Sequence, residues 1–264
     1  GVEIVWHSFN AGPSAMEAVF ADAINLTYVG PNPVLNAYVR SKGGVLVMSG
    51  AVRGGAGLVV PKGSPLSEPA DFVGKSIATP QFGNTQDIAC RYWLITAGLK
   101  VTMTGGDVTV VPTANPSILP LFLSQQVDAA WTVEPWVSRL EMEGGGQLVY
   151  SEPADTSLTT VLSAGADFLD REPEMAAKFV AAHQALTEWI LANPEEAKTR
   201  VAAELTRQMR REFPLELVAH AWPRLVFSNA IGVREFTFSL QAAQTAGFVT
   251  EEPGDISGLV AGSQ

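Results

Sequence analysis

Short apolar runs alternate with helical segments along the first part of this 264-residue chain. Residues 2–6 and 24–29 are rich in β-branched and aromatic side chains typical of strands, whereas 13–20 and 33–41 carry apolar residues at helical spacing. A strand followed by a helix and another strand is the building unit of a parallel sheet. The order therefore predicts an α/β fold in which helices cover a parallel sheet.

The same alternation continues in a second unit. Two more strands are predicted at 45–49 and 57–60, and a new unit begins after Pro65. Its predicted strands lie at 76–79, 108–111 and 128–131, and its predicted helices lie at 85–97 and 118–125. A strand-like run and four helical segments then follow at 159–162, 174–191, 194–205, 215–222 and 235–246.

The late helices need an existing core to pack on. If they return to the first unit, the chain crosses between two lobes near 59–61 and again near 150–158, which makes a two-segment hinge. We therefore predict a lobe I of residues 1–60 plus 159–264 and a lobe II of residues 61–158. A chain of 264 residues is long enough for two such lobes, each with its own core and with a cleft between them.

Charge and composition exclude several classes of protein. The chain has 17 Lys and Arg against 27 Asp and Glu, a net charge of -10, which is the wrong sign for nucleic-acid binding. With 47% hydrophobic and 17% charged residues, a soluble globular protein is expected. No apolar run reaches the length of a membrane span, and no signal-peptide pattern begins the chain, so we expect that any signal or lipid anchor has been removed or was never present.

Catalytic and metal-binding patterns are weak. The one cysteine, Cys90, lies in a helical pattern and is expected to be a buried, inert thiol. The three histidines, His7, His183 and His220, lack the spacing of metal ligands, and structural roles are expected for them. Neither a nucleophile elbow nor a phosphate-binding loop is present. We therefore expect no cofactor and no enzymatic activity.

Three turns share one design that suits an anion. Residues 10–14, 30–33 and 81–86 each combine glycine with Pro or Asn just before a predicted helix. The free N–H groups and the dipole of a helix N-terminus attract anions without Lys or Arg. An ordinary capped helix is the alternative for any single turn, but three turns at the carboxyl ends of strands favour a shared cleft. The candidate residues are Gly12, Pro13, Ser14, Gly30, Asn32, Gly83, Asn84, Thr85 and Gln86.

Three further residues are candidates on other grounds. Trp131 would either form an aromatic wall for a ligand or cap the core, and Glu134 would bind an ammonium, a hinge group or a distant arginine. Arg53 lies in a glycine-rich approach to the first crossing, where it would either clamp a carboxylate or sulfonate or remain a solvated surface residue.

These motifs resemble, in order, those of the periplasmic solute-binding proteins of nitrate, sulfonate and taurine ABC importers. Residues 6–13 (WHSFNAGP) are similar to the family's Trp-x-x-Phe-x-x-Gly-Pro pattern, and 24–33 to a segment with Asp where this chain has Asn25. Residues 71–75 (DFVGK) are similar to its Asp-Leu-Lys-Gly-Lys. Its two second-lobe cleft motifs are matched by 83–87 (GNTQD) and 130–136 (AWTVEPW), which look closest to the aliphatic-sulfonate branch.

The resemblance implies a two-lobed, Venus-flytrap α/β fold that closes on a small anionic or polar solute and then docks on the membrane permease of an ABC importer. It also implies a monomer in the periplasm or outside the cell, free or lipid-anchored. In the family, a strand, a ligand-contacting turn and a helix would precede the residue equivalent to Gly1, so part of the cleft is expected to be missing here. Arg53, where relatives often carry a small residue, suggests an acidic solute.

Other solutes and functions stay open at this point. Nitrate, a carboxylate or aromatic acid, or a pyrimidine-type heterocycle would fit the same scaffold. The resemblance also links the fold to enzymes that form the thiamin pyrimidine, although these carry a cysteine-rich motif and this chain has only Cys90. The effector domain of a transcription regulator is a third class.

Overall fold

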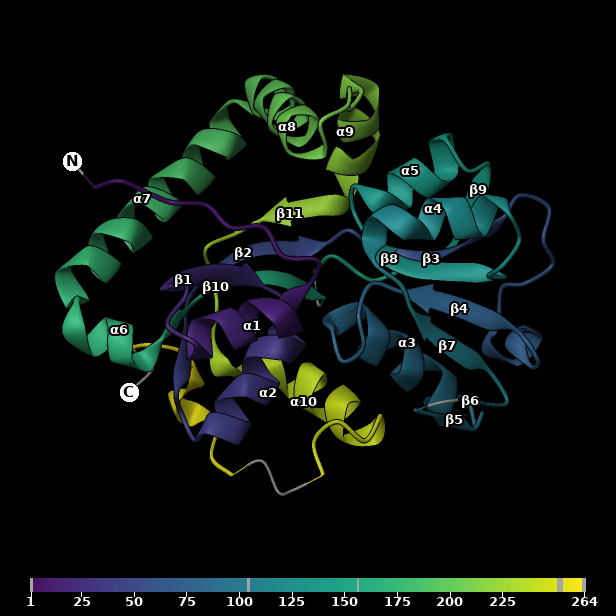
Figure 1. Ribbon diagram of the computed structural model, residues 1–264, viewed down its shortest axis with the longest axis horizontal. Coiled ribbons are helices and arrows are strands. Elements are labelled where there is room, and N and C mark those ends of the chain that lie inside the picture. The colour runs from purple at the N-terminus through teal and green to yellow at the C-terminus, as the bar shows by residue number, and fades with distance from the viewer. Residues whose placement is uncertain (1, 104, 156, 251–253, 263–264) are drawn as a thin grey trace.

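The computed structural model describes residues 2–103, 105–155, 157–250 and 254–262. Its strands form two large sheets, one in each half of the molecule (Figure 1). The first sheet has four strands, every neighbouring pair of which is antiparallel, in the order β1 (Leu26–Val29), β10 (Leu158–Gly165), β2 (Val45–Gly54) and β11 (Leu225–Phe227).

Helices cover both faces of the first sheet. One core joins it to α1 (Gly12–Phe20), α2 (Pro31–Ser41) and α10 (Phe236–Thr245), through buried residues that include Val19, Leu35 and Phe236. A second, smaller cluster joins β10 to α6 (Ala166–Arg171) and α7 (Pro173–Ala192). The chain then continues through α8 (Pro194–Met209) and α9 (Leu215–Ala221), which pack on each other.

His183 anchors the long helix α7 to the first sheet. Its Nε2 lies 2.8 Å from the carbonyl oxygen of Gly50, and its Nδ1 lies 2.9 Å from the hydroxyl of Tyr28. A carbonyl only accepts hydrogen bonds, so Nε2 carries the proton and Nδ1 accepts from the tyrosine. The buried histidine therefore has the structural role expected for it.

The second sheet is mixed. Its order is β7 (Thr109–Pro112), β4 (Ser76–Thr79), β8 (Ala129–Val133), β3 (Ala56–Pro61) and β9 (Gly146–Ser151). Strand β4 runs parallel to β7 and β8, and β3 runs antiparallel to β8 and β9. α3 (Thr85–Thr96) packs on one face, α4 (Asn115–Leu123) and α5 (Trp136–Met142) pack on the other, and a small hairpin of β5 (Val101–Thr102) and β6 (Gly105–Gly106) lies beside α3.

Two sequence expectations about strands are wrong. Residues 2–6 form no strand, because no partner strand lies along their backbone. Their apolar side chains are exposed, and that of Val5 is 70% exposed. The first sheet is not parallel, because β10 returns from the second unit and lies antiparallel between β1 and β2. The strand expected at 57–60 is present as part of β3, and it is hydrogen-bonded into the second sheet.

The first crossing between the sheets consists of two consecutive glycines. Gly54 and Gly55 connect β2 to β3 with φ of +69° and +74°, a region that L-residues with a side chain rarely adopt. The second crossing is the segment between β9 and β10, and the N–H of Gly54 donates to the carbonyl of Ser157 there at 2.8 Å. The exact division into residues 1–60 plus 159–264 and 61–158 stays a prediction.

C-terminal elements connect the two halves a further time. Helix α10 packs against α2 of the first half and α3 of the second, and α9 packs against α5. The 3₁₀ turn η2 (Trp222–Arg224) follows α9 and leads into β11, whereas η1 (Pro69–Phe72), η3 (Val233–Glu235) and η4 (Ser257–Leu259) are other short turns. Within the described residues, no helix is long and apolar enough to cross a membrane.

Candidate functional site

A cavity of about 1000 Å³ extends from the junction of the two sheets along strand β1. Its inner end is lined by the N-terminal turns of four helices: Gly12 of α1, Gly30 before α2, Asn84 and Thr85 at α3, and Asn115 of α4. The first turn of a helix leaves N–H groups without intrahelical acceptors, so donors from both halves of the molecule surround this end.

Helix α3 offers the strongest set of donors. Pro13, Pro31 and Pro33 have no N–H, so α1 and α2 present fewer free donors in their first turns. In α3, the described residues provide no acceptor for the backbone N–H of Thr85 or Gln86. These two N–H groups lie at the positive end of a 12-residue helix, where an anion is stabilised.

Thr85 has a hydroxyl without a partner. Its side chain is buried, and Oγ1 makes no hydrogen bond to any described residue. The group lies directly opposite Gly30, because a Cβ built on that glycine would overlap Thr85 Oγ1. A buried hydroxyl without a partner carries a free-energy cost of about 1–3 kcal/mol.

A buried ion pair holds the turn before α3. Gly83 has φ +73°, and its N–H donates to Asp87 Oδ2 at 3.0 Å. The same carboxylate accepts from Thr79 Oγ1 at 2.8 Å and from Arg91 Nε at 3.1 Å, while the Asn84 side chain caps the helix by accepting from Asp87 N. The position of the donors of α3 thus depends on Asp87, which sequence reasoning did not single out.

The predicted residues separate into two groups. Six of them line the cavity: Gly12, Gly30, Asn84, Thr85, Gln86 and Glu134. Ser14 lies just outside and bridges the halves, with Oγ 2.9 Å from Gln81 Nε2, and Gly83 and Pro13 shape the turns. Asn32 donates to the carbonyl of Ser239 at 2.8 Å and does not reach the cavity.

Two predicted residues lie elsewhere. Arg53 does not line the cavity, because its guanidinium binds Glu235 Oε1 at 3.2 Å and the carbonyl of Ala230. Trp131 is 1% exposed and belongs to the core of the second sheet, where its Nε1 donates to Glu152 Oε1 at 2.9 Å. Of the alternatives considered for Trp131, the structure thus favours the core residue over the ligand wall.

Glu134 has its carboxylate turned to protein partners. Oε1 accepts from Ser138 Oγ at 2.9 Å and from Arg224 Nη1 at 2.7 Å, and Oε2 accepts from Ser138 N at 2.9 Å. The side chain is only 1% exposed. The distant arginine considered from the sequence is therefore Arg224, which lies 90 positions further along the chain.

Among the polar residues of the cavity that sequence reasoning missed are Asn10, Asn115 and Thr159. Asn10 donates from Nδ2 to the carbonyl of Pro80 at 2.9 Å, and its Oδ1 accepts from the N–H of Asn115 at 3.3 Å. Thr159 also lines the cavity and donates to the carbonyl of Gly54. A signal for Asn10 was available, because it begins the first glycine turn, whereas Asn115 and Thr159 are placed only by the packing of the two sheets.

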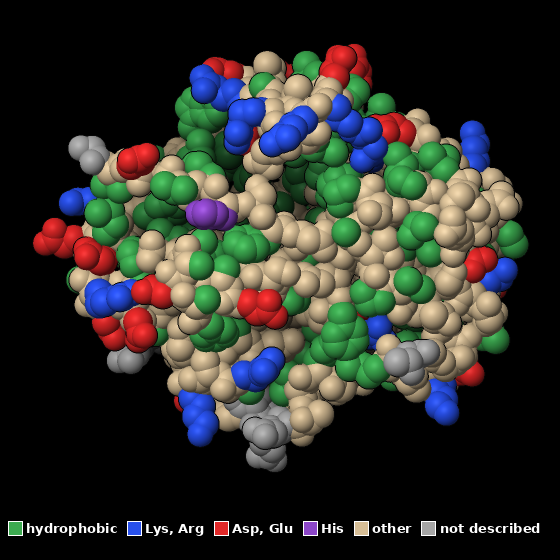
Figure 2. Space-filling model, in the orientation of Figure 1, with side chains coloured by type: hydrophobic (Ala, Val, Ile, Leu, Met, Phe, Trp, Pro, Cys, Tyr) green, Lys and Arg blue, Asp and Glu red, His purple; other side chains and the backbone are tan. Residues whose placement is uncertain are grey.

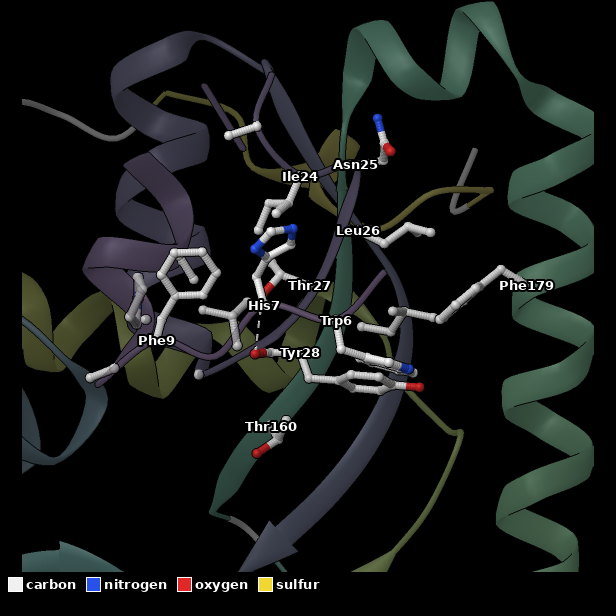
Figure 3. Close-up of a pocket in the computed structure, with 18 of the residues that line it drawn as sticks. Trp6, His7, Phe9, Ile24, Asn25, Leu26, Thr27, Tyr28, Thr160 and Phe179 are labelled. Carbon is white, nitrogen blue, oxygen red and sulfur yellow. Dashed lines mark hydrogen bonds between the residues drawn. The ribbon is translucent and has the colours of Figure 1, made fainter. Parts of the chain in front are cut away.

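The other end of the cavity carries apolar side chains beside polar ones. Figure 3 shows Trp6 and Phe9 from the N-terminal segment, Leu26 and Tyr28 from β1 and Phe179 from α7 around it. The polar residues of the lining there include His7, Asn25 and Thr27. Arg171 is the one Lys or Arg in the described lining, and it pairs with Asp22 at 3.0 Å. Figure 2 shows Lys and Arg side chains gathered over the α8–α9 end of the molecule. The cavity thus combines neutral donors at one end with a lining of both apolar and polar side chains at the other.

Metal and thiol chemistry have little support at this site. No group of three or more His, Cys, Asp or Glu residues that could hold a metal occurs within the described parts of the chain. Cys90 is buried as expected, and burial, together with the charge of Asp87, raises the pKa of its thiol well above the ordinary value. A thiol in that state is a poor nucleophile.

Residues 1–206 match the NMT1-like family. This chain belongs to that family. The taurine-binding periplasmic protein of Escherichia coli (strain K12) is 24% identical over 198 residues, which are 74% of this chain and 60% of that protein. The chain therefore spans about 60% of the length of the curated relatives that it matches.

Two solved structures show the fold of this NMT1-like chain. The alkanesulfonate-binding protein SsuA from Xanthomonas axonopodis pv. citri bound to MOPS has a TM-score of 0.76 at 20% identity, covering 99% of this chain and 87% of that one. The periplasmic aliphatic sulphonate binding protein SsuA from Escherichia coli has a TM-score of 0.69 at 20% identity, with 89% and 78% covered. The prediction of a two-lobed α/β periplasmic-binding-protein fold is confirmed.

Proposed function

We propose that this chain is the solute-binding component of an ABC importer and captures a small anion such as an aliphatic sulfonate or taurine. The observation that carries the proposal is the meeting of helix N-termini around Thr85, whose hydroxyl has no described partner. A sulfonate oxygen there would accept from the N–H groups of Thr85 and Gln86 and from the Thr85 hydroxyl.

The shape of the cavity supports a sulfonate with an organic group. The donors lie at the inner end, and the apolar lining by Phe9, Tyr28 and Phe179 would receive an alkyl or ring portion. Nitrate would leave this surface uncovered, whereas a carboxylate, an aromatic acid or a pyrimidine-type heterocycle would use both ends. These solutes are therefore the alternatives to be tested beside sulfonates.

The same features support a role in transport rather than catalysis. The relatives named above bind solutes, and the described lining of the cavity supplies neutral donors at its inner end. We further propose that the chain works as a monomer outside the cytoplasm, either free or lipid-anchored, that the closed form docks on a permease, and that nucleic acid is not a partner. An enzyme or a regulator effector domain would be revealed by turnover of the bound solute or by a linked DNA-binding domain.

Thermal unfolding against a panel of solutes tests the proposal. Ethanesulfonate, taurine, MOPS, nitrate, sulfate, benzoate and a pyrimidine are each added at increasing concentration. A ligand at about 100 times its dissociation constant adds about 2.7 kcal/mol to the free energy of unfolding. We expect the largest shift with a sulfonate, and a flat response from every anion in folded protein would refute anion binding.

A matched pair of variants locates the site. Thr85→Val removes the unpartnered hydroxyl, and we expect it to weaken sulfonate binding about tenfold, the loss of one hydrogen bond to a charged group. Thr96→Val on the same helix is the control, because its exposed hydroxyl bonds only to the helix backbone. Equal affinity of both variants for ethanesulfonate, measured by calorimetry, would place the solute elsewhere.

A further inference from the structure

Glu134 poses an electrostatic problem for the proposed anion site. Its carboxylate belongs to a residue that lines the same cavity as the donors of α3. A carboxylate repels an anion, and the repulsion is stronger in a water-poor cleft than in bulk water. An anion site that includes this residue therefore needs a nearby positive charge.

Arg224 is the one described cation with a nitrogen within 4.0 Å of Glu134. Nη1 lies 2.7 Å from Glu134 Oε1, and Nη2 lies 2.7 Å from Glu141 Oε2. Burial alone would lower the pKa of Arg224, but hydrogen bonds and the charges of Glu134 and Glu141 outweigh it and raise that pKa, so the guanidinium is charged. His220 contacts Glu141 as well, at 3.1 Å, and does not reach Glu134.

The ion pair between Arg224 and Glu134 also joins one half of the molecule to the other. Arg224 immediately precedes β11 of the first sheet, whereas Glu134 follows β8 of the second sheet. Gly55 of the first crossing packs between Glu134 and Leu225, the residue after Arg224, because a Cβ built there would lie 3.5 Å from Glu134 Cγ and 2.5 Å from Leu225 Cδ2. In the arrangement of the halves seen here, Glu134 is therefore paired with a positive charge that it shares with Glu141.

We propose that Arg224 is a specificity-determining residue that neutralises Glu134 across the hinge, so that the cavity accepts an anionic solute when the two halves are together. The inference rests on the proposed function and deepens it. Arg224 acts through Glu134 and is a positioning residue, since it does not line the cavity itself. Opening the halves would separate the pair, return the negative charge to the cavity and favour release of the anion.

A double-mutant cycle tests this role with ethanesulfonate as the probe, measured by calorimetry on the whole chain. Arg224→Gln leaves the carboxylate without its counter-ion and is expected to weaken binding about tenfold. Glu134→Gln removes the repelling charge and is expected to tighten binding. The double variant should bind within about threefold of the parent, because neither charge is left.

Two further variants separate charge from structure. Arg224→Lys keeps the positive charge without the planar fork, and we expect it to recover most of the affinity that Arg224→Gln loses. Arg211→Gln is the matched control, because Arg211 lies in the same region and contacts Glu143 at 3.9 Å rather than Glu134. Thermal unfolding of each variant shows whether it is folded.

The outcomes distinguish this inference from the proposed function. If the parent binds ethanesulfonate and Arg224→Gln binds equally well, or if the double variant is as weak as Arg224→Gln, charge cancellation is refuted while the transport function stands. If the folded parent binds no anion in the panel, the proposed function and this inference are both refuted. Recovery in the double variant and in Arg224→Lys would support the inference.

Discussion

At the scale of single residues, the donors of α3 depend on groups that do not touch the cavity. Asp87 is fully buried and binds the N–H of Gly83, the hydroxyl of Thr79 and the guanidinium of Arg91. A buried ion pair adds little net stability, but removing one partner leaves a buried charge uncompensated. Asp87 therefore holds the glycine turn in place, and its contribution to stability becomes measurable only when its side chain is replaced.

Asp87→Asn should lower the free energy of unfolding by about 3–5 kcal/mol, because Arg91 is left buried without its carboxylate. Glu196→Gln is the control, since Glu196 and Arg200 have the same four-residue spacing on an exposed helix surface. We expect that change to cost less than about 1 kcal/mol. Urea denaturation measures both, and equal costs would contradict the role of Asp87.

The carboxyl of Glu152 is expected to make the stability of the protein depend on pH. Burial raises the pKa of its carboxyl, although hydrogen bonds from Trp131 and Ser157 act to lower it. The folded state therefore holds the proton more tightly than the unfolded chain, and this carboxyl costs stability as the pH rises above its ordinary value of 4.5. The cost is absent below that value and grows until the folded-state pKa is reached.

Glu152→Gln stays neutral and keeps an acceptor for Trp131 Nε1. We expect it to be more stable than the parent, by a margin that is larger at about pH 8 than at about pH 5. Urea denaturation at both pH values measures the margin, and Glu188→Gln, on the exposed surface of α7, is the control. A margin that is the same at both pH values would show that burial does not perturb Glu152.

At the scale of elements, the two glycines between β2 and β3 connect the sheets. An L-residue with a side chain in the left-handed conformation of Gly55 costs roughly 1–2 kcal/mol. Gly55→Ala should lower the free energy of unfolding by more than this, because the added Cβ would also lie 2.5 Å from Leu225 Cδ2. Gly63→Ala is the control, with φ +80° and no atom within 4 Å of the added Cβ. Urea denaturation compares them, and equal losses would mean that the crossing tolerates a side chain.

At the scale of the whole molecule, two sets of contacts join the halves in addition to the crossings. Asn10 and Ser14 bridge to Pro80 and Gln81, and α10 packs against α3. The rings of Phe82, just before α3, and Phe248, just after α10, lie 4.8 Å apart. Contacts of this kind favour the closed arrangement, and a ligand that touches both halves adds to them.

Phe248→Ala should shift the molecule toward an open arrangement. An aromatic pair contributes about 0.5–1.5 kcal/mol beyond its buried area, so we expect roughly 2- to 10-fold weaker sulfonate binding. Small-angle scattering of the ligand-free protein should show a larger radius of gyration. Phe20→Ala is the control, because Phe20 is 52% exposed at the end of α1. Unchanged scattering and affinity would show that the α3–α10 contact does not govern closure.

The sequence by itself determined the α/β class, most helices, the second unit and the glycine turns at the cavity, because capping, periodicity and backbone freedom act over a few residues. Only the tertiary structure decided that β10 separates β1 from β2, that residues 2–6 form no strand, and that Arg53 and Trp131 turn away from the cavity. Strand pairing and ion pairs join distant residues, such as Glu134 and Arg224 at 90 positions apart, and local patterns carry no information about such partners.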